Sequence, residues 1–238
     1  FELIRLLGQG GFARVWQAHD TARGCDVALK LVRGGIVSPK TAVKILTQEF
    51  AHRDRIGDTT HVLSVERPRT ERLGEIDLVL MPMELADGGT LRDWMKARRG
   101  AVQTEHLDAA LDLFEQACRG TEAIHAAGLV HLDLKPENLL LVGGTLKVAD
   151  LGLSRDLERL SAVAPELLRD GVGSPLYMAP EQVESARPDD IETLADVWSL
   201  GVILFELLDG KTPFVGRAAE VRKKIANRNL SISYRRVP

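Results

Sequence analysis

The first 84 residues carry short apolar segments that alternate with glycine-containing turns, and one longer segment with a different spacing. The apolar segments cover residues 3–7, 14–18, 26–32, 62–65 and 76–83. Short apolar runs bounded by turn residues are typical of strands in an antiparallel sheet. In residues 41–55, polar residues separate the apolar Val43, Ile45, Leu46 and Phe50, and this spacing predicts a helix.

After a natural hinge at residues 87–89, Asp-Gly-Gly, the spacing of apolar residues becomes helical. One helix is predicted to start at Leu91, and others cover residues 189–208 and 218–226. A stripe with spacings of three and four predicts a further helix that contains Leu107, Leu111, Phe114, Cys118, Thr121 and Ile124. Strands followed by helices predict an α+β fold with two lobes. Residues 1–84 would form a small antiparallel sheet with one helix, and residues 85–238 a larger, mainly helical lobe.

The composition is that of an ordinary globular protein. The 238 residues are 45% apolar and 27% charged, which suits one large domain or two lobes with a sizeable core. Lys and Arg total 31 against 34 for Asp and Glu, and the formal net charge of −3 gives no reason to expect a nucleic-acid partner. The longest apolar run, residues 197–208, is too short to span a bilayer, so no membrane segment is predicted within the chain.

The two cysteines, Cys25 and Cys118, lie far apart and have no metal-ligand spacing. Two free thiols in a reducing compartment are therefore predicted. The chain starts at Phe1 without a signal-peptide pattern and stops at Pro238. We expect an excerpt of a longer protein, either cytoplasmic or the cytoplasmic domain of a membrane-anchored one.

Residues 131–138, His-Leu-Asp-Leu-Lys-Pro-Glu-Asn, concentrate the polar groups that phosphoryl transfer requires. They contain the Asp133 carboxylate, the Lys135 amine and the Asn138 carboxamide, and a second carboxylate, Asp150, follows twelve residues later before Leu-Gly. The stretch resembles the catalytic loop and the metal-binding triplet of the eukaryotic-like Ser/Thr protein kinases. The resemblance implies the two-lobed protein kinase fold.

The resemblance also implies a role for each of these polar groups. Asp133 would accept a hydrogen bond from the substrate hydroxyl and take its proton, and Lys135 would stabilise charge on the γ-phosphate of ATP. Asn138 and Asp150 would hold Mg²⁺. His131 is expected to pack and form hydrogen bonds rather than to act as an acid or base.

Residues 8–15, Gly-Gln-Gly-Gly-Phe-Ala-Arg-Val, are similar to the glycine-rich loop of that family, with Ala13 in place of its last glycine. Glycines let backbone N–H groups approach phosphate oxygens closely. The turn of an ordinary hairpin has a similar composition, so this segment is a weak signal by itself. The resemblance implies that the nucleotide is surrounded by Leu7, Gly8, Gln9, Gly10, Gly11, Phe12, Ala13 and Val15.

Lys30 stands in an otherwise apolar predicted strand, fifteen residues after Val15. A buried ammonium needs an opposite charge, and the resemblance assigns Lys30 to the nucleotide phosphates with a helix glutamate as its partner. Glu49, nineteen residues downstream on the predicted helix, is the candidate for that partner.

Residues 81–86, Met-Pro-Met-Glu-Leu-Ala, correspond by resemblance to the segment beside the adenine pocket. Met83 would flank the purine, and the backbones of Glu84 and Ala86 would face its edge. Ala28 and Leu140 would add apolar contacts together with Leu7 and Val15. An ordinary strand that leads into a linker would have the same sequence pattern.

Residues 174–181, Ser-Pro-Leu-Tyr-Met-Ala-Pro-Glu, resemble the segment that receives a peptide substrate, and Ser174 and Glu181 are its candidate docking residues. Asp196 matches the helix residue that bonds amides of the catalytic loop. Small-molecule kinases share the His-x-Asp loop but lack this docking stretch. Its presence therefore favours a protein substrate with Ser or Thr hydroxyls.

The chain departs from the family pattern at several places. Leu132 replaces an arginine that in many relatives pairs with an activating phosphate, so we hypothesise that activity does not require phosphorylation of Ser154 or Ser161. Leu151 replaces a Phe and should keep its packing role. The last helices of the family are expected to be absent after residue 226.

Three functional hypotheses follow from the sequence. The first is an ATP- and Mg²⁺-dependent Ser/Thr protein kinase, for which autophosphorylation is a further expectation. The second is a pseudokinase that binds nucleotide or a partner without catalysis, suggested by Ala13, Leu132 and the short C-terminus. The third is a small-molecule phosphotransferase, which leaves residues 174–181 without an explanation.

Overall fold

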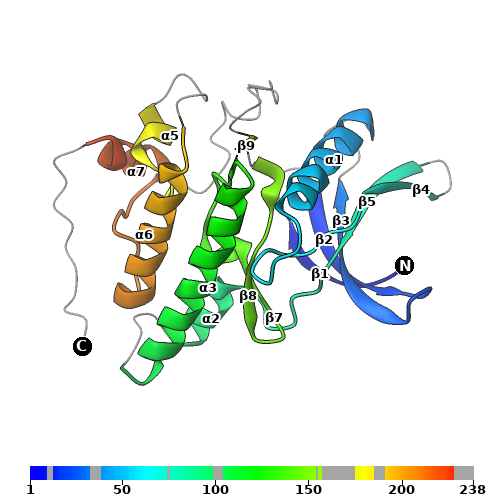
Figure 1. The fold of residues 1–238 in the computed structure, drawn as a ribbon, viewed down its shortest axis with the longest axis horizontal. Coiled ribbons are helices and arrows are strands. Elements are labelled where there is room, and N and C mark those ends of the chain that lie inside the picture. The colour runs from blue at the N-terminus through cyan, green and yellow to red at the C-terminus, as the bar shows by residue number, and fades with distance from the viewer. Residues whose placement is uncertain are drawn as a thin grey trace.

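The computed structural model describes residues 1–9, 13–32, 39–73, 76–98, 104–153, 155–156, 175–184 and 191–227. Figure 1 shows the sheet with helix α1 (Pro39–Ile56) over it, and a larger, mainly helical part beside them. The antiparallel-sheet lobe and the helical lobe have the order that the sequence predicts, so the predicted fold class is confirmed.

The small lobe contains one five-stranded sheet in the order β1-β2-β3-β5-β4, with all strand pairs antiparallel. Helix α1 packs on one of its faces, where Leu46 meets Val79 and Met81 in a buried cluster. Strand β4, which the apolar pattern missed, has the polar sequence Arg-Thr-Glu-Arg-Leu. The elements of this lobe are β1 (Glu2–Gln9), β2 (Ala13–Asp20), β3 (Cys25–Val32), α1 (Pro39–Ile56), β4 (Arg69–Leu73) and β5 (Ile76–Met83).

The strand predicted for residues 62–65 is wrong. Val62 forms an isolated bridge with Val148 in the large lobe, and Val65 forms one with Met83 in the small lobe. Because the two ends of this segment pair with different lobes, no continuous ladder forms. The segment instead connects the lobes, with Leu63 N donating to Val148 O at 2.8 Å.

The large lobe is built around helices α3 and α6, which lie side by side (Figure 1). Its described helices are α2 (Leu91–Ala97), α3 (Leu107–Ala126), α5 (Pro180–Glu184), α6 (Leu194–Asp209) and α7 (Ala218–Ala226). Short 3₁₀ turns cover Thr104–His106, Pro136–Asn138 and Leu151–Leu153. Two small antiparallel sheets of two strands complete the lobe: β6 (Leu129–Val130) pairs with β9 (Arg155–Asp156), and β7 (Leu139–Val142) forms a hairpin with β8 (Thr145–Val148).

Two predictions for these helices need correction. Helix α6 begins at Leu194 rather than at residue 189, after a turn at Thr193. On α3 the predicted stripe only partly matches the buried face, since Leu111 is 43% exposed. The buried face is lined by smaller residues as well, which lets neighbouring elements approach closely; it consists of Ala110, Leu113, Ala117, Gly120, Thr121 and Ile124.

Gly120 marks the closest approach between α3 and the segment that connects the lobes. A Cβ atom at this position would lie 2.3 Å from His61 O and 2.6 Å from a methyl carbon of Val148. His61 O accepts the hydrogen bond of Val148 N at 2.8 Å and cannot move without breaking it. Only glycine fits here without displacing the backbone.

Gly120→Ala should therefore lower the free energy of unfolding by about 2 kcal/mol, because overpacking displaces a bonded backbone. Urea unfolding followed by circular dichroism measures the change. Gly201→Ala on α6 is the matched control, since nothing lies within 4 Å of the added carbon. That control should be neutral or stabilising by up to about 1 kcal/mol. Equal stability of the two variants would contradict the packing argument.

Candidate active site

Lys30 is the point where three elements from both lobes meet. Its Nζ donates to Oε1 and Oε2 of Glu49 at 2.8 and 2.7 Å, and to Oδ1 of Asp150 at 2.9 Å. Lys30 and Glu49 are 7% and 3% exposed, whereas about half of the Asp150 side chain is open to solvent. The contact between Lys30 and Glu49 that the sequence suggested is present.

The opposite charges of Lys30 and Asp150 stabilise each other. Burial acts to lower the pKa of Lys30, but the carboxylates of Asp150 and Glu49 outweigh it and raise this pKa above its ordinary value. The Lys30 ammonium lowers the pKa of Asp150 to about 2. Burial raises the pKa of Glu49, and the ammonium opposes that shift. Lys30 and Asp150 are therefore both charged at neutral pH.

The loop between β6 and β7 is held in place by α6. Asp196, which is fully buried, accepts hydrogen bonds from the backbone N–H groups of His131 and Leu132 at 2.8 and 2.9 Å. His131 is also fully buried, and its Nε2 lies 3.0 Å from Ala149 O. Its Nδ1 accepts from Asp133 N at 3.2 Å. Asp196 and His131 thus make the kind of contacts that were predicted for them, and together they fix the loop that carries Asp133.

Asp133, Lys135 and Asn138 contact one another directly. Oδ2 of Asp133 accepts from Lys135 Nζ at 2.6 Å and from Asn138 Nδ2 at 3.1 Å. Asn138 Nδ2 also donates to Asp133 O at 2.8 Å. The amide nitrogen of Asn138 is thereby engaged with the loop, which leaves its Oδ1 as an acceptor for another group.

The hairpin β7–β8 brings Asn138 and Asp150 to the same end of the site. Leu139 lies opposite Val148, and Ala149 N donates to Asn138 O at 2.9 Å, so Asp150 directly follows the residue paired with Asn138. The two groups formed by Lys30 and by Asp133 are joined through this hairpin. The structure therefore gathers all four polar residues on which the sequence interpretation depends.

The oxygen atoms of Asn138 and Asp150 suit a hard divalent cation. Mg²⁺ is commonly bound by one or two protein oxygens together with water and substrate phosphates. Within the described residues, no group of three or more His, Cys, Asp or Glu side chains could hold a metal by itself. A site with two protein ligands fits a metal that arrives with a phosphate ligand.

Strand register puts several candidate nucleotide-binding residues on the sheet face that carries Lys30. Val15 lies opposite Lys30, and Ala28 lies opposite Met83. Because Ala28 is two residues from Lys30 in β3, these four side chains share one face. The chain then continues from Met83 into the linker with Glu84 and Ala86.

Other candidate nucleotide-binding residues belong to neighbouring strands. Leu7 falls in a bulge of β1, next to Gly8, which pairs with Val15. Ala13 starts β2 and is buried, and Leu140 in β7 bridges to Thr90. Gln9 pairs with Arg14. Gly10, Gly11 and Phe12 lie outside the described residues.

Three ion pairs that the sequence interpretation missed stabilise the surroundings of the site. Lys147 Nζ on β8 contacts both carboxylate oxygens of Glu84 at 2.7 and 2.9 Å, which ties the linker to the large lobe. Arg92 on α2 donates to Glu206 on α6 at 2.7 Å and to Glu137 in the loop that carries Asp133 at 2.7 Å. No local spacing indicated any of these pairs, because each joins residues far apart in the sequence.

Part of the predicted docking segment is described. Tyr177 is buried, accepts a hydrogen bond from Arg92 and donates one to Oε2 of Glu206 at 2.5 Å. Burial together with the Glu206 carboxylate raises the pKa of Tyr177. Glu181 lies in α5, which packs against α6 and α7. Ser174, and the two serines at 154 and 161, lie outside the described residues.

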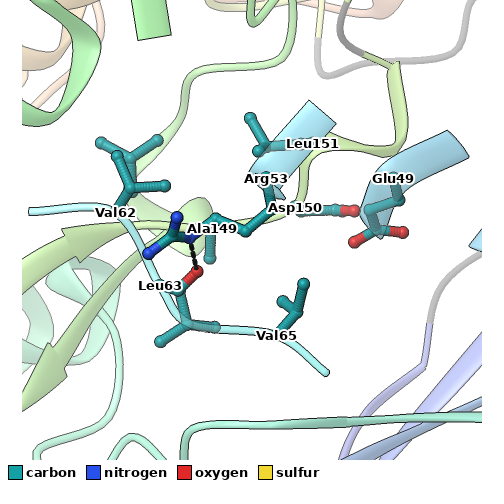
Figure 2. Close-up of a pocket in the computed structure, with 9 residues that line it drawn as sticks. Glu49, Arg53, Val62, Leu63, Val65, Ala149, Asp150 and Leu151 are labelled. Atoms are coloured by element: carbon teal, nitrogen blue, oxygen red, sulfur yellow. Dashed lines mark hydrogen bonds between the residues drawn. The ribbon is translucent and has the colours of Figure 1, made fainter. Parts of the chain in front are cut away.

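Behind the Lys30 cluster, a small pocket separates α1 from the segment that follows β8. Figure 2 shows Glu49 and Asp150 at one side of it and the Arg53 guanidinium reaching Leu63. Arg53 Nε donates to Leu63 O at 2.8 Å, and Nη1 donates to Gly57 O at 2.6 Å. Burial lowers the pKa of Arg53. Arg53 thus connects α1 to the segment that joins the lobes.

Comparison with known proteins agrees with this geometry. The family model described as the protein kinase domain matches residues 1–236. The chain is 33% identical over 221 residues to serine/threonine-protein kinase PknA of Mycobacterium tuberculosis, covering 92% of this chain and 49% of the relative. It is 34% identical over 230 residues to CBL-interacting protein kinase 22 of Oryza sativa, with 90% and 49% covered. The chain spans about half the length of these curated relatives.

No helix in the described parts of the chain combines the length and the apolar character needed to cross a membrane.

Arg53→Met should destabilise the domain by about 2 kcal/mol, because two carbonyl groups lose charge-assisted hydrogen bonds. The free energy of unfolding from urea titration measures the effect. Arg119→Met is the control: its guanidinium pairs with Glu115 on an exposed helix face at 2.7 Å, where such pairs contribute about 0.5 kcal/mol or less. If Arg53→Met cost no more than the control, the guanidinium would not hold α1 in place.

Proposed function

This chain belongs to the protein kinase domain family, and on that basis we propose that it transfers the γ-phosphate of ATP to Ser and Thr hydroxyls of protein substrates. The proposal rests on two clusters of polar side chains, Lys30 with Glu49 and Asp150, and Asp133 with Lys135 and Asn138. The hairpin β7–β8 joins these clusters, because Asn138 and Asp150 lie at its two ends. Family membership implies ATP and a divalent metal. Mg²⁺ is our proposal for that metal.

In the proposed mechanism, Asp133 acts on the substrate hydroxyl that accepts the phosphoryl group. Its carboxylate accepts a hydrogen bond from the substrate hydroxyl and takes the proton as the acceptor oxygen bonds to the γ-phosphorus. The bond from that phosphorus to the β-phosphate bridging oxygen breaks, and ADP leaves. Lys135, whose Nζ lies 2.6 Å from Asp133, is close enough to this carboxylate to meet negative charge on the transferring group.

Lys30 binds the α- and β-phosphates, and Glu49 orients its ammonium. Asn138 and Asp150 would hold the divalent cation, which when bound supplies positive charge to the phosphate oxygens. The purine is proposed to lie between the apolar side chains of Leu7, Val15, Ala28, Met83 and Leu140, with its edge toward the backbones of Glu84 and Ala86. Gly8 to Ala13 would cover the phosphates.

We place the boundary between a nucleotide-binding lobe, 1–84, and a substrate-binding lobe, 85–238, at the Glu84 linker. The family implies protein substrates, and PknA is named a serine/threonine-protein kinase. Glu181 and Ser174 are the proposed docking residues. Autophosphorylation on the chain's own serines and work in a reducing, cytoplasmic compartment are further proposals, the latter supported by the free thiols of Cys25 and Cys118.

Asp133→Asn should lower kcat for peptide phosphorylation by about 10²–10⁴-fold, since the amide cannot take the proton. The measurement follows label from γ-phosphate-labelled ATP into peptides that carry a single Ser or a single Thr, with Mg²⁺ present. ATP binding should persist in the variant, because Asp133 is not among the proposed phosphate or metal ligands. Removing the metal with EDTA should stop transfer, and added Mg²⁺ should restore it.

Asp112→Asn is the control for this substitution, because it removes the same charge from an exposed position on α3. It should retain wild-type turnover. A wild-type chain that binds ATP but labels no peptide would reveal a pseudokinase, and labelling of a small hydroxylated molecule in preference to peptide would reveal a different phosphotransferase.

The combined substitution Ser154→Ala and Ser161→Ala should leave peptide phosphorylation within about twofold of wild type. Residue 132 is Leu, so the catalytic loop offers no cation before Asp133 to pair with a phosphate on that segment. Initial rates at saturating ATP test the expectation. A collapse of the rate in the double variant would show that one of these hydroxyls is required.

A further inference from the structure

Gln182 on α5 contacts two separate segments of the chain, and the mechanism above does not use it. Its Oε1 accepts a hydrogen bond from Ala179 N at 2.8 Å, and its Nε2 donates to Leu132 O at 3.0 Å. Ala179 belongs to the proposed docking segment, and Leu132 directly precedes Asp133. One half-buried side chain therefore joins the docking segment to the backbone beside the proposed catalytic carboxylate.

The residue that Gln182 holds is in an unfavourable conformation. Leu132 has φ 67°, in the left-handed region that residues other than glycine seldom adopt. Its N–H donates to Oδ1 of Asp196 at 2.9 Å, and its carbonyl accepts from Gln182. Each side of this residue thus has a partner from a different helix, and a rotation about Leu132 would move Asp133.

The chemistry of the Gln182 side chain indicates that its Nε2 donor, which binds Leu132 O, is the important group. A Glu or Gln side chain in the first turn of a helix often accepts a hydrogen bond from the backbone N–H three residues earlier. A glutamate would serve Ala179 N equally well, but at neutral pH it would set a carboxylate oxygen against the carbonyl oxygen of Leu132. Only the amide satisfies both partners.

We infer that Gln182 is a positioning residue that couples the docking segment to Asp133 and holds the carboxylate in place for the acceptor hydroxyl. The inference rests on the proposed kinase function. It makes the geometry of the catalytic loop depend on a carboxamide rather than on a charged group.

The test compares Gln182→Glu, which keeps the acceptor and loses the donor, with Gln182→Met, which loses both. At pH 8, kcat for peptide phosphorylation should fall about tenfold in both variants, since small misplacements of a catalytic group are costly. The KM for ATP should not change. As the pH falls toward 5, the introduced carboxyl gains a proton and can donate again, so Gln182→Glu should recover relative to wild type while Gln182→Met should not.

Gln116→Glu on α3 is the control. Gln116 also accepts a hydrogen bond from a distant backbone N–H, that of Leu146, and donates one to the side chain of Asp112. It should show wild-type kcat at every pH. Thermal unfolding of all variants provides the structural readout, and the midpoints should stay within about 5 °C of wild type.

The outcomes separate the two proposals. If the wild type transfers phosphate and Gln182→Glu matches it at pH 8, or loses activity without recovery on acidification, the role of Gln182 is refuted and the kinase function stands. A midpoint lowered by more than about 5 °C in both variants would make the contact structural and would equally refute it. If the wild type itself transfers no phosphate, the proposed function falls and takes the inference with it.

Discussion

The buried ammonium of Lys30 is the constraint on which the arrangement of the two lobes depends. A charged amine in an apolar sheet is strongly unfavourable unless opposite charges surround it. Glu49 reaches it from α1, and Asp150 reaches it from the segment after β8. A strand and a helix of the small lobe and a loop of the large lobe must therefore converge at one point. The same convergence leaves the Lys30 ammonium beside the partly exposed Asp150 carboxylate, where the proposed phosphate–metal complex would bind.

The convergence is supported by a second set of contacts behind it. Arg53 fixes α1 to Leu63, and Leu63 N is bonded to Val148 in β8, two residues before Asp150. The helix that supplies Glu49 and the loop that supplies Asp150 thus share one backbone support. Displacing α1 would disturb this support and the ion pair together, so the position of Glu49 is coupled to the position of the large lobe.

The sequence allowed the prediction of features that depend on short spacing. The helix over 218–226 needs only local pattern, the run from Asp133 to Asn138 is identified by its resemblance to a family motif, and Glu49 is chosen because that resemblance implies a helix glutamate as the partner of Lys30. Residues 62–65 could not be predicted correctly, because their partners lie in two different lobes. The contacts of Gln182 were equally hidden, since its partner Leu132 is fifty residues away. Long-range polar contacts have no sequence periodicity, and the chain must fold before they can be identified.

The loop that carries Asp133 illustrates how such contacts decide local geometry. A left-handed conformation at Leu132 costs about 1–2 kcal/mol, and nothing in a leucine side chain favours it. A hydrogen bond typically contributes about 0.5–1.5 kcal/mol, and Leu132 makes two of them, from its N–H to Asp196 and to its carbonyl from Gln182, so α6 and α5 together offset the strain. Because the conformation is imposed through main-chain groups, the side chain at 132 is free to vary. The orientation of Asp133 is therefore set by distant side chains that bind its neighbours' backbone, and a leucine can stand where the family often has an arginine.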